Sequence, residues 1–149
     1  FPENHPKRPE LVKLLGSIAD GIIKHQDAES GVWYQVVDES GREGNYLEST
    51  ASAMYCYNLL RAVRLGLLPE SYREAGIKAY NGILDKFIVT AEDGTVSLTE
   101  CCAVAGLGGG SSQRRNGSFE YYISEPKRDN DAKGVGPFIL ASLEMEQMK

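Results

Sequence analysis

The sequence has few residues suited to cross-linking or to metal binding. Its 149 residues include three cysteines and two histidines. Cys101 and Cys102 are adjacent and Cys56 lies in an apolar stretch, a pattern that provides no disulfide framework. The spacing of these cysteines and His25 matches no zinc signature. We therefore expect no metal site.

Basic charge and long apolar runs are also scarce. Asp and Glu number 21 against 16 Lys and Arg, for a net charge of −5, whereas nucleic-acid-binding proteins carry basic patches. No apolar run approaches the roughly 20 residues that span a bilayer, and no signal-peptide pattern opens the chain. We expect neither nucleic acid nor a membrane among its partners. Because Phe1 stands where a methionine would start a protein, we also expect the chain to be part of a longer one.

The composition and its periodicity indicate a folded helical protein. Hydrophobic residues make up 42% and charged residues 25%, a balance typical of globular proteins. Apolar residues recur on one face from Pro9 to Lys24 and from Pro69 to Ile88, which predicts two amphipathic helices. Over 49–65 and 134–148 they surround the helix axis, which predicts two buried helices. A turn and a short strand-like run are expected over 90–99.

The order of these helices favours an α/α toroid. Amphipathic and buried helices alternate, and an aromatic segment precedes each buried helix, at Trp33-Tyr34 and again at 119–122. Repeated helix pairs are typical of solenoids and toroids, whereas the helices of a bundle are all amphipathic to a similar degree. Four helices do not close a toroid, so the buried helices require further neighbours. The glycine-rich segment 105–118 is expected to be a loop.

The aromatic segments are expected to meet at one end of the helical layer, where they are candidates for sugar binding. Flat rings beside amides, carboxylates and cations suit a sugar. Trp33 fits a sugar platform or a packing wedge equally well. Of Tyr121 and Tyr122, we expect one to lie in the core and the other to be exposed.

Acidic and small polar residues flank the buried helices. Glu48 directly precedes the helix at 49–65, where a carboxylate can cap the helix or stand at the mouth of a substrate cavity. Ser52 lies one turn further, where a small polar side chain allows a ligand to approach. Asp129 and Asp131 are expected to cap the last helix. No pair of carboxylates with glycosidase spacing and no Ser-His-Asp arrangement stands out.

Six ordered motifs cover essentially the whole chain: Gly31–Asp38, Gly44–Ser49, Asp93–Thr99, Val104–Gly109, Phe119–Pro126 and Asn130–Gly136. Together they resemble the C-terminal part of glycoside hydrolase family 105, the unsaturated rhamnogalacturonyl hydrolases, which are related to the unsaturated glucuronyl hydrolases of family 88. The resemblance implies an all-α fold in which residues 1–149 form the C-terminal portion of an (α/α)6 barrel, a six-hairpin toroid. About four helices with short strand-like loops would belong to this chain.

The resemblance also implies an activity. Members of the family remove a 4,5-unsaturated uronic acid from pectin-derived rhamnogalacturonan oligosaccharides, and neither a metal nor an organic cofactor is implied. An aspartate hydrates the double bond, and the resulting hemiketal collapses. That aspartate and its Trp-x-Arg-Gly-Asn-Gly-Trp segment lie upstream of the matched region and do not occur here, so we expect this chain alone to be inactive. Trp33, Glu48 and Ser52 carry over as substrate-binding positions.

Two alternatives to a piece of an enzyme stay open, a non-catalytic carbohydrate-binding half-barrel and a helical scaffold for protein partners. Exposed apolar faces on the helices at 49–65 and 134–147 would signal helices supplied from elsewhere. A homo-oligomer that buries those faces is one such arrangement. The sequence leaves open the exact uronide and a location in the bacterial cytoplasm or periplasm.

Overall fold

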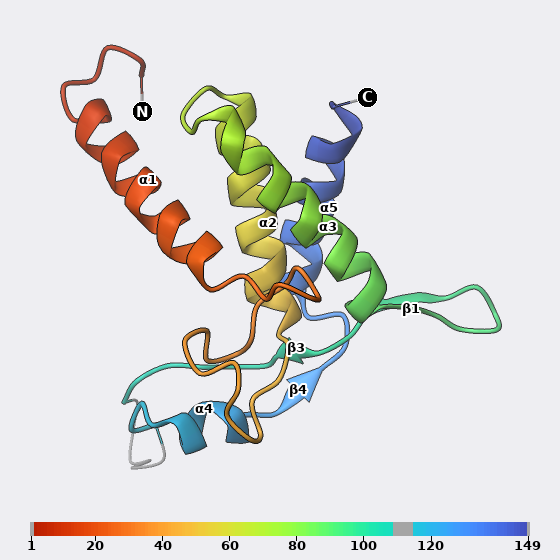
Figure 1. The fold of residues 1–149 in the computed structure, drawn as a ribbon. Helices are drawn as coiled ribbons and strands as arrows, with labels where there is room; N and C mark the ends of the chain where they lie inside the picture. Colours follow the sequence, from red (N-terminus) through yellow and green to blue (C-terminus); the bar gives the residue numbers. More distant parts are fainter. Residues whose placement is uncertain (1, 109–114, 149) are drawn as a thin grey trace.

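The computed structural model describes residues 2–108 and 115–148, so residues 109–114 of the expected glycine-rich loop lie outside the described residues. Four long helices dominate the chain (Figure 1). The helical elements are α1 (Arg8–Lys24), α2 (Ser49–Arg64), the 3-10 turn η1 (Glu70–Tyr72), α3 (Arg73–Phe87), the short α4 (Phe119–Ser124) and α5 (Ala132–Glu146). The four long helices expected from the sequence are confirmed.

Two small antiparallel ladders join the helices. A hairpin pairs β1 (Ile88–Thr90) with β2 (Val96–Leu98), so the turn and strand expected over 90–99 are confirmed. A second ladder pairs β3 (Cys101–Cys102) with β4 (Lys127–Arg128). The β1–β2 hairpin extends away from the helices, whereas β3 and β4 lie below them, close to α4 (Figure 1).

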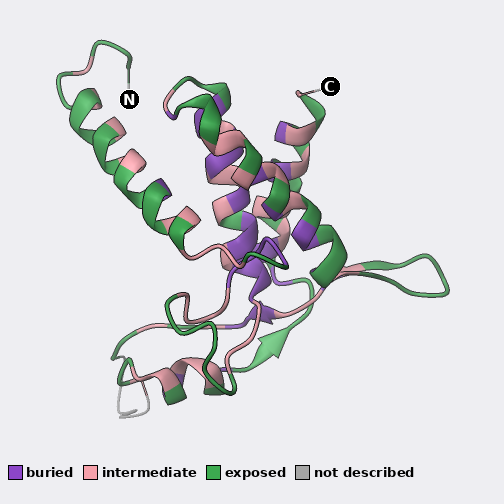
Figure 2. Cartoon of the chain, in the orientation of Figure 1, coloured by how far each residue is buried: buried purple, intermediate pink, exposed green. Residues whose placement is uncertain are grey.

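Helix α2 is the centre of the fold. It packs against α5 and against α3, and nine of its 16 residues are buried. The expected buried helix is therefore confirmed, and the burial colours in Figure 2 concentrate along it. Gly66 follows its last turn with a φ of +66°, a left-handed conformation that ends helices and suits glycine.

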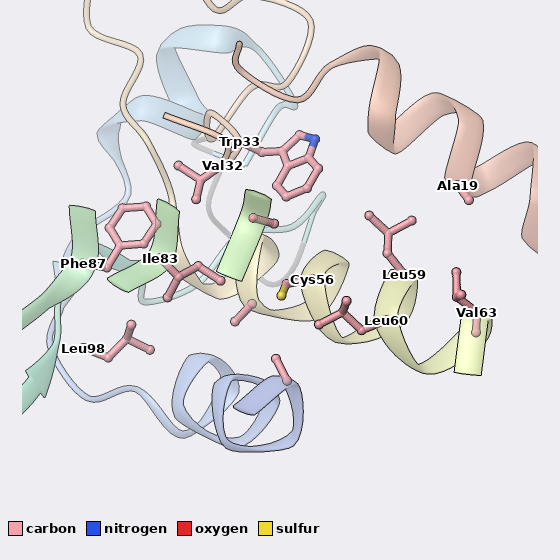
Figure 3. Packing of buried hydrophobic residues seen from close by; sticks show 14 of the residues in the cluster. Ala19, Val32, Trp33, Cys56, Leu59, Leu60, Val63, Ile83, Phe87 and Leu98 are labelled. Carbon is pink, nitrogen blue, oxygen red and sulfur yellow. The ribbon is translucent and has the colours of Figure 1, made fainter. Parts of the chain in front are cut away.

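The core gathers around α2 (Figure 3). Trp33, Phe87, Leu59 and Ile83 are among the largest fully buried side chains, and each such side chain contributes roughly 1.5–3 kcal/mol when removed from water. A charged link joins α2 to α5 at the edge of this core. The buried carboxylate of Glu144 accepts from Arg61 Nη1 at 2.9 Å and Arg64 Nε at 2.5 Å, which satisfies a group that would be costly to bury alone.

Helix α1 covers the core with only part of its apolar stripe. Pro9 stands in its first turn, as expected. Among the described residues of α1, Ala19 alone is fully buried. Leu15, Ile22 and Ile23 are partly buried and pack against the core. Three further members of the stripe are exposed at 41%, 56% and 50%, namely Leu11, Leu14 and Ile18. The whole apolar stripe of α1 was expected to cover a core. The structure buries only the side of the stripe that carries Ala19, and no described segment covers the side that carries Leu11, Leu14 and Ile18.

Helix α5 is also open on one side. Phe138 stacks on Tyr80 with ring centroids 5.8 Å apart, and Ala141 is fully buried. Three apolar residues on another face are exposed at 53%, 42% and 48%, namely Ile139, Leu140 and Leu143. The helix was expected to be buried on most sides, and the structure buries only the face that meets α2 and α3. No described helix is long and apolar enough to cross a membrane.

Gly82 sets how closely α3 approaches the loop that follows α1. A Cβ at this position would lie 2.1 Å from the carbonyl oxygen of Ser30 and 3.0 Å from Val32 Cγ1. Only glycine allows this contact, because the nearest atom is a main-chain carbonyl oxygen, which cannot move aside as a flexible side chain can. Gly16 on α1 is the reverse case, since a Cβ there would meet no atom within 4 Å.

We therefore predict that Gly82→Ala lowers the free energy of unfolding by about 1–3 kcal/mol, as overpacking against a rigid neighbour does. The matched variant Gly16→Ala should raise it by up to about 1 kcal/mol, because alanine is the better helix former. Urea unfolding followed by circular dichroism measures both. Equal effects of the two substitutions would contradict the close contact at Gly82.

A second prediction concerns Asp131, which caps α5. Its carboxylate accepts from the Lys133 backbone N–H at 2.9 Å and lies 3.0 Å from Arg128 Nε. The hydrogen bond from the Lys133 side chain, then that from its backbone N–H, lower the pKa of Asp131 below the ordinary 3.8. A lowered pKa stabilises the fold above pH 3.8, and this contribution is lost as the pH falls through the folded-state value.

Asp131→Asn should accordingly lower the melting temperature at neutral pH, with the difference from wild type shrinking as the pH falls below 3.8. Asp129→Asn is the control, since it removes the same charge two residues away, at an exposed position before α5. The earlier expectation that both aspartates cap α5 thus holds for Asp131. A melting-temperature difference that persists unchanged at low pH would refute the role of the charged cap.

Candidate functional site

The two aromatic segments meet at one end of the helical layer, below the helices in Figure 1. The guanidinium of Arg42 lies 3.9 Å from the centroid of the Phe119 ring, and Lys127 Nζ lies 4.7 Å from the centroid of Tyr46. Cations stack favourably on aromatic faces. The expectation that hairpin geometry brings the segments 31–48 and 117–133 together is therefore confirmed, and we call this surface the loop end.

The cations of the loop end are also paired with carboxylates. Arg42 Nη2 donates to Glu120 Oε1 at 2.5 Å, and Lys127 Nζ donates to Glu100 Oε2 at 2.5 Å. All four side chains of these two pairs are at least 40% exposed, so each pair contributes at most about 1 kcal/mol to stability. Such weakly held charges can exchange their partner for a ligand at little cost.

Glu48 occupies the buried centre of the loop end. Its residue is 2% exposed, and its carboxylate accepts three backbone hydrogen bonds. Two come from the first turn of α2, from Thr50 N at 2.9 Å and Ala51 N at 2.6 Å. The third comes from Cys102 N on β3 at 2.8 Å. The expected helix cap is confirmed, and the same carboxylate also fixes a strand 54 residues away in sequence.

Trp33 and Ser52 join Glu48 in one network. The Glu48 N–H donates to the Trp33 carbonyl at 2.9 Å, the Ser52 hydroxyl donates to the Glu48 carbonyl at 2.6 Å, and the Trp33 N–H donates to Ser52 Oγ at 3.1 Å. The three residues predicted to bind substrate therefore lie together. All are buried, and the Trp33 indole N–H donates to the Ile22 carbonyl at 2.7 Å. Their contact with a sugar stays a prediction.

Sequence reasoning missed the residues that surround this network. Gln35 Nε2 donates to Cys102 Sγ at 3.3 Å, and the hydroxyl of Tyr46 is buried without a hydrogen-bond partner among the described residues. Burial first, then Cys102, raises the pKa of Tyr46 above its ordinary value, so the phenol stays neutral. No local signal could reveal these contacts, because Cys102 reaches Glu48 and Gln35 only through the tertiary fold.

The second aromatic segment forms the short helix α4, capped by the Ser118 hydroxyl, rather than an extended run. Tyr121 is 4% exposed, and its hydroxyl accepts from Gly106 N at 3.0 Å. Tyr122 is half-buried beside it, with ring centroids 5.0 Å apart. One tyrosine thus lies in the core as expected, but helical geometry keeps the other partly covered where alternation predicted exposure.

Three of the four buried carboxylates of the described chain accept hydrogen bonds that hold the fold. Glu48 caps α2, Asp131 caps α5, and Glu144 receives two arginines. Glu125 is the exception: it is 3% exposed and lies 3.6 Å from Arg115 Nε, and neither of its carboxylate oxygens has a hydrogen-bond partner among the described residues. Within residues 2–108 and 115–148, no three His, Cys, Asp or Glu side chains cluster as metal ligands. Glu48, Asp131 and Glu144 therefore have structural roles, whereas Glu125 is a buried carboxylate whose one ion-pair partner is Arg115.

We predict that Glu48→Gln lowers the free energy of unfolding by roughly 1–3 kcal/mol, because a buried donor or acceptor is left without its partner. The amide keeps the shape of the side chain but replaces one of the oxygens that accept from Thr50, Ala51 and Cys102. Glu10→Gln, at a side chain 72% exposed, is the control and should change stability by less than about 0.5 kcal/mol. Thermal and urea unfolding measure both, and equal stabilities would contradict the central role of Glu48.

The chain is similar in sequence and in fold to known glycoside hydrolases. The model of Glycosyl Hydrolase Family 88 matches residues 1–149. A solved glycoside hydrolase of family 105 from C. acetobutylicum is 50% identical with a TM-score of 0.94, and the match covers 99% of this chain and 40% of that one. A possible family 105 member from Salmonella enterica is 26% identical with a TM-score of 0.79, over 99% of this chain and 34% of that one.

Two curated relatives are also similar to this chain. Protein Atu3128 of Agrobacterium fabrum and the 24.9 kDa protein in the picA locus of Rhizobium radiobacter are each 44% identical over 139 residues, which cover 91% of this chain and 59% of theirs. The chain thus spans about three-fifths of these relatives and two-fifths of the C. acetobutylicum protein. Since the family model covers its whole length and its helices superpose on the family 105 structure, the chain belongs to glycosyl hydrolase family 88 and forms part of an (α/α)6 barrel.

Proposed function

We propose that this chain is part of an enzyme that removes 4,5-unsaturated uronic acid from rhamnogalacturonan oligosaccharides by hydrating the double bond of the sugar. The observation that carries the proposal is the match to the C. acetobutylicum family 105 protein, at 50% identity over 99% of this chain. The sequence motifs that resemble family 105 support the same substrate class.

The loop end supports a carbohydrate substrate. Half-buried rings lie next to exposed ion pairs there. Phe119 lies beside the pair of Arg42 and Glu120, and Tyr46 lies beside Lys127. Rings stack on the C–H faces of sugars, and cations bind the uronate carboxylate. Within this proposal, Trp33, Glu48 and Ser52 contribute to binding by fixing the main chain of the loop end, since their side chains are buried.

We further propose that the catalytic aspartate lies outside residues 1–149. Three of the four buried carboxylates of the described chain, Glu48, Asp131 and Glu144, are held by hydrogen bonds in structural positions. The fourth, Glu125, lies 3.6 Å from Arg115 Nε. A general acid must instead have its proton free to transfer to the substrate. The absence of the family's Trp-x-Arg-Gly-Asn-Gly-Trp segment from the sequence agrees with this assignment.

The test follows the ultraviolet absorbance of the double bond in an unsaturated rhamnogalacturonan disaccharide. A polypeptide that joins residues 1–149 to the unmatched part of the C. acetobutylicum protein should consume the disaccharide, and residues 1–149 alone should not. The matched saturated disaccharide should release no free sugar, because hydration needs the double bond. Turnover by residues 1–149 alone would overturn the placement of the catalytic acid. Consumption of unsaturated glucuronyl disaccharides, with the rhamnogalacturonan disaccharide left intact, would overturn the substrate.

A further inference from the structure

The chain contains two Asn-Gly pairs, Asn81-Gly82 and Asn116-Gly117. In such a pair the side-chain amide lies beside a main-chain nitrogen that no Cβ shields, because glycine has no side chain. That nitrogen can attack the amide carbon and close a five-membered succinimide ring, which makes asparagine one of the thermolabile residues of proteins. Both asparagines are exposed, so the backbone around each one decides whether it reacts.

Helix α3 holds the first pair in a conformation that prevents the reaction. Both residues lie in the interior of this helix, where each N–H donates to the carbonyl four residues earlier. Helical geometry therefore directs the Gly82 N–H toward the Lys78 carbonyl and away from the Asn81 side chain. Gly82 is also buried, and a Cβ there would lie 2.1 Å from the Ser30 carbonyl oxygen. Ring closure would require this turn of the helix to open and its packing to be lost.

The second pair lies in a different setting. Asn116 and Gly117 precede α4 and belong to neither a helix nor a strand, and both are exposed. Gly117 has a φ of +79°, a conformation that glycine adopts without strain. No helical hydrogen bond therefore directs the Gly117 nitrogen away from the preceding side chain.

A hydrogen bond also prepares the Asn116 amide for attack. The Ser118 N–H donates to Asn116 Oδ1 at 3.0 Å, which closes an Asx turn whose ring of atoms includes the Gly117 nitrogen. Negative charge develops on Oδ1 when a nitrogen adds to the amide carbon. A main-chain donor aimed at that oxygen favours the addition, as the donors of an oxyanion hole do.

We propose that Asn116 is a site of spontaneous deamidation. The Gly117 nitrogen loses its proton and bonds to Asn116 Cγ, while the Cγ–Nδ2 bond breaks and the amide nitrogen takes up a proton and leaves as ammonia. Water then opens the succinimide ring at one of its two carbonyl carbons, which yields aspartate or isoaspartate. Water is the only co-reactant, and no oxidant, reductant or cofactor takes part. The inference is independent of the proposed substrate.

The products change the start of α4 at the loop end. Each places a new carboxylate directly after Arg115, which can then leave the buried Glu125 carboxylate that lies 3.6 Å from its Nε. Isoaspartate also adds one carbon to the main chain two residues before Ser118. The Ser118 hydroxyl caps α4 by accepting from Tyr121 N at 3.1 Å, so the modification disturbs this cap.

The test incubates residues 1–149 at physiological temperature and mildly alkaline pH and follows both amides by mass spectrometry. Digestion with a glutamate-specific protease at acidic pH leaves Asn116 inside residues 101–120 and Asn81 inside residues 75–92. The peptide with Asn116 should gain the mass of an amide-to-acid conversion about tenfold faster or more than the other, because Asn81 reacts only when α3 opens. In concentrated urea the two rates should become similar. Asn116→Gln should abolish the fast conversion, since its longer side chain cannot close a five-membered ring.

A second measurement keeps the test decisive if residues 1–149 do not fold separately. The same comparison is made in the polypeptide that joins them to the unmatched part of the C. acetobutylicum protein, and the result in this folded polypeptide decides. Equal rates at Asn116 and Asn81 there, or an unmodified Asn116, would overturn the proposal. The modified fraction, separated by its added charge, should melt at a lower temperature than the unmodified fraction. Identical melting would overturn the effect on α4.

Discussion

The buried carboxylate of Glu48 is the interaction on which the rest of the loop end depends. Three backbone N–H groups donate to it, two from the start of α2 and one from Cys102 on β3. A buried charge is tolerated only where hydrogen bonds replace its water, so the first turn of α2 and the β3–β4 ladder must both be in place. Its main chain then fixes Trp33 and Ser52, which in turn anchor the loop after α1.

The loop end is held together by this network, whereas the first and last helices, α1 and α5, each carry exposed apolar side chains. The loops converge on α2, whose buried residues contact α3 and α5. By contrast, α1 and α5 each lack a neighbour on one side within the described chain. A barrel wall needs a helix on both sides of every inner helix, and this chain provides two-fifths of the length of the C. acetobutylicum protein.

Much of the fold was predictable because its signals are local. Helical periodicity, Pro9, Gly66 and the Asp93-Gly94 turn define the helices and the hairpin from neighbouring residues, and the structure follows them. The cap at Glu48 was one of two interpretations that the sequence allowed, the other being an acid at the mouth of a substrate cavity, and the structure shows the cap. The short helix α4 was not predictable, because its six residues are too few for periodicity to distinguish a helix from an extended segment.

The sequence by itself determined the family, the helix order and the segments that meet at the loop end, because motifs and periodicity are properties of the chain. Only the tertiary structure decided which groups contact the charged side chains. It placed Cys102 N on Glu48 and stacked Arg42 on Phe119, contacts between residues far apart in sequence. It also decided which faces of α1 and α5 are exposed. An apolar stripe in the sequence shows that a helix packs against other segments, but it does not show which part of the stripe those segments cover.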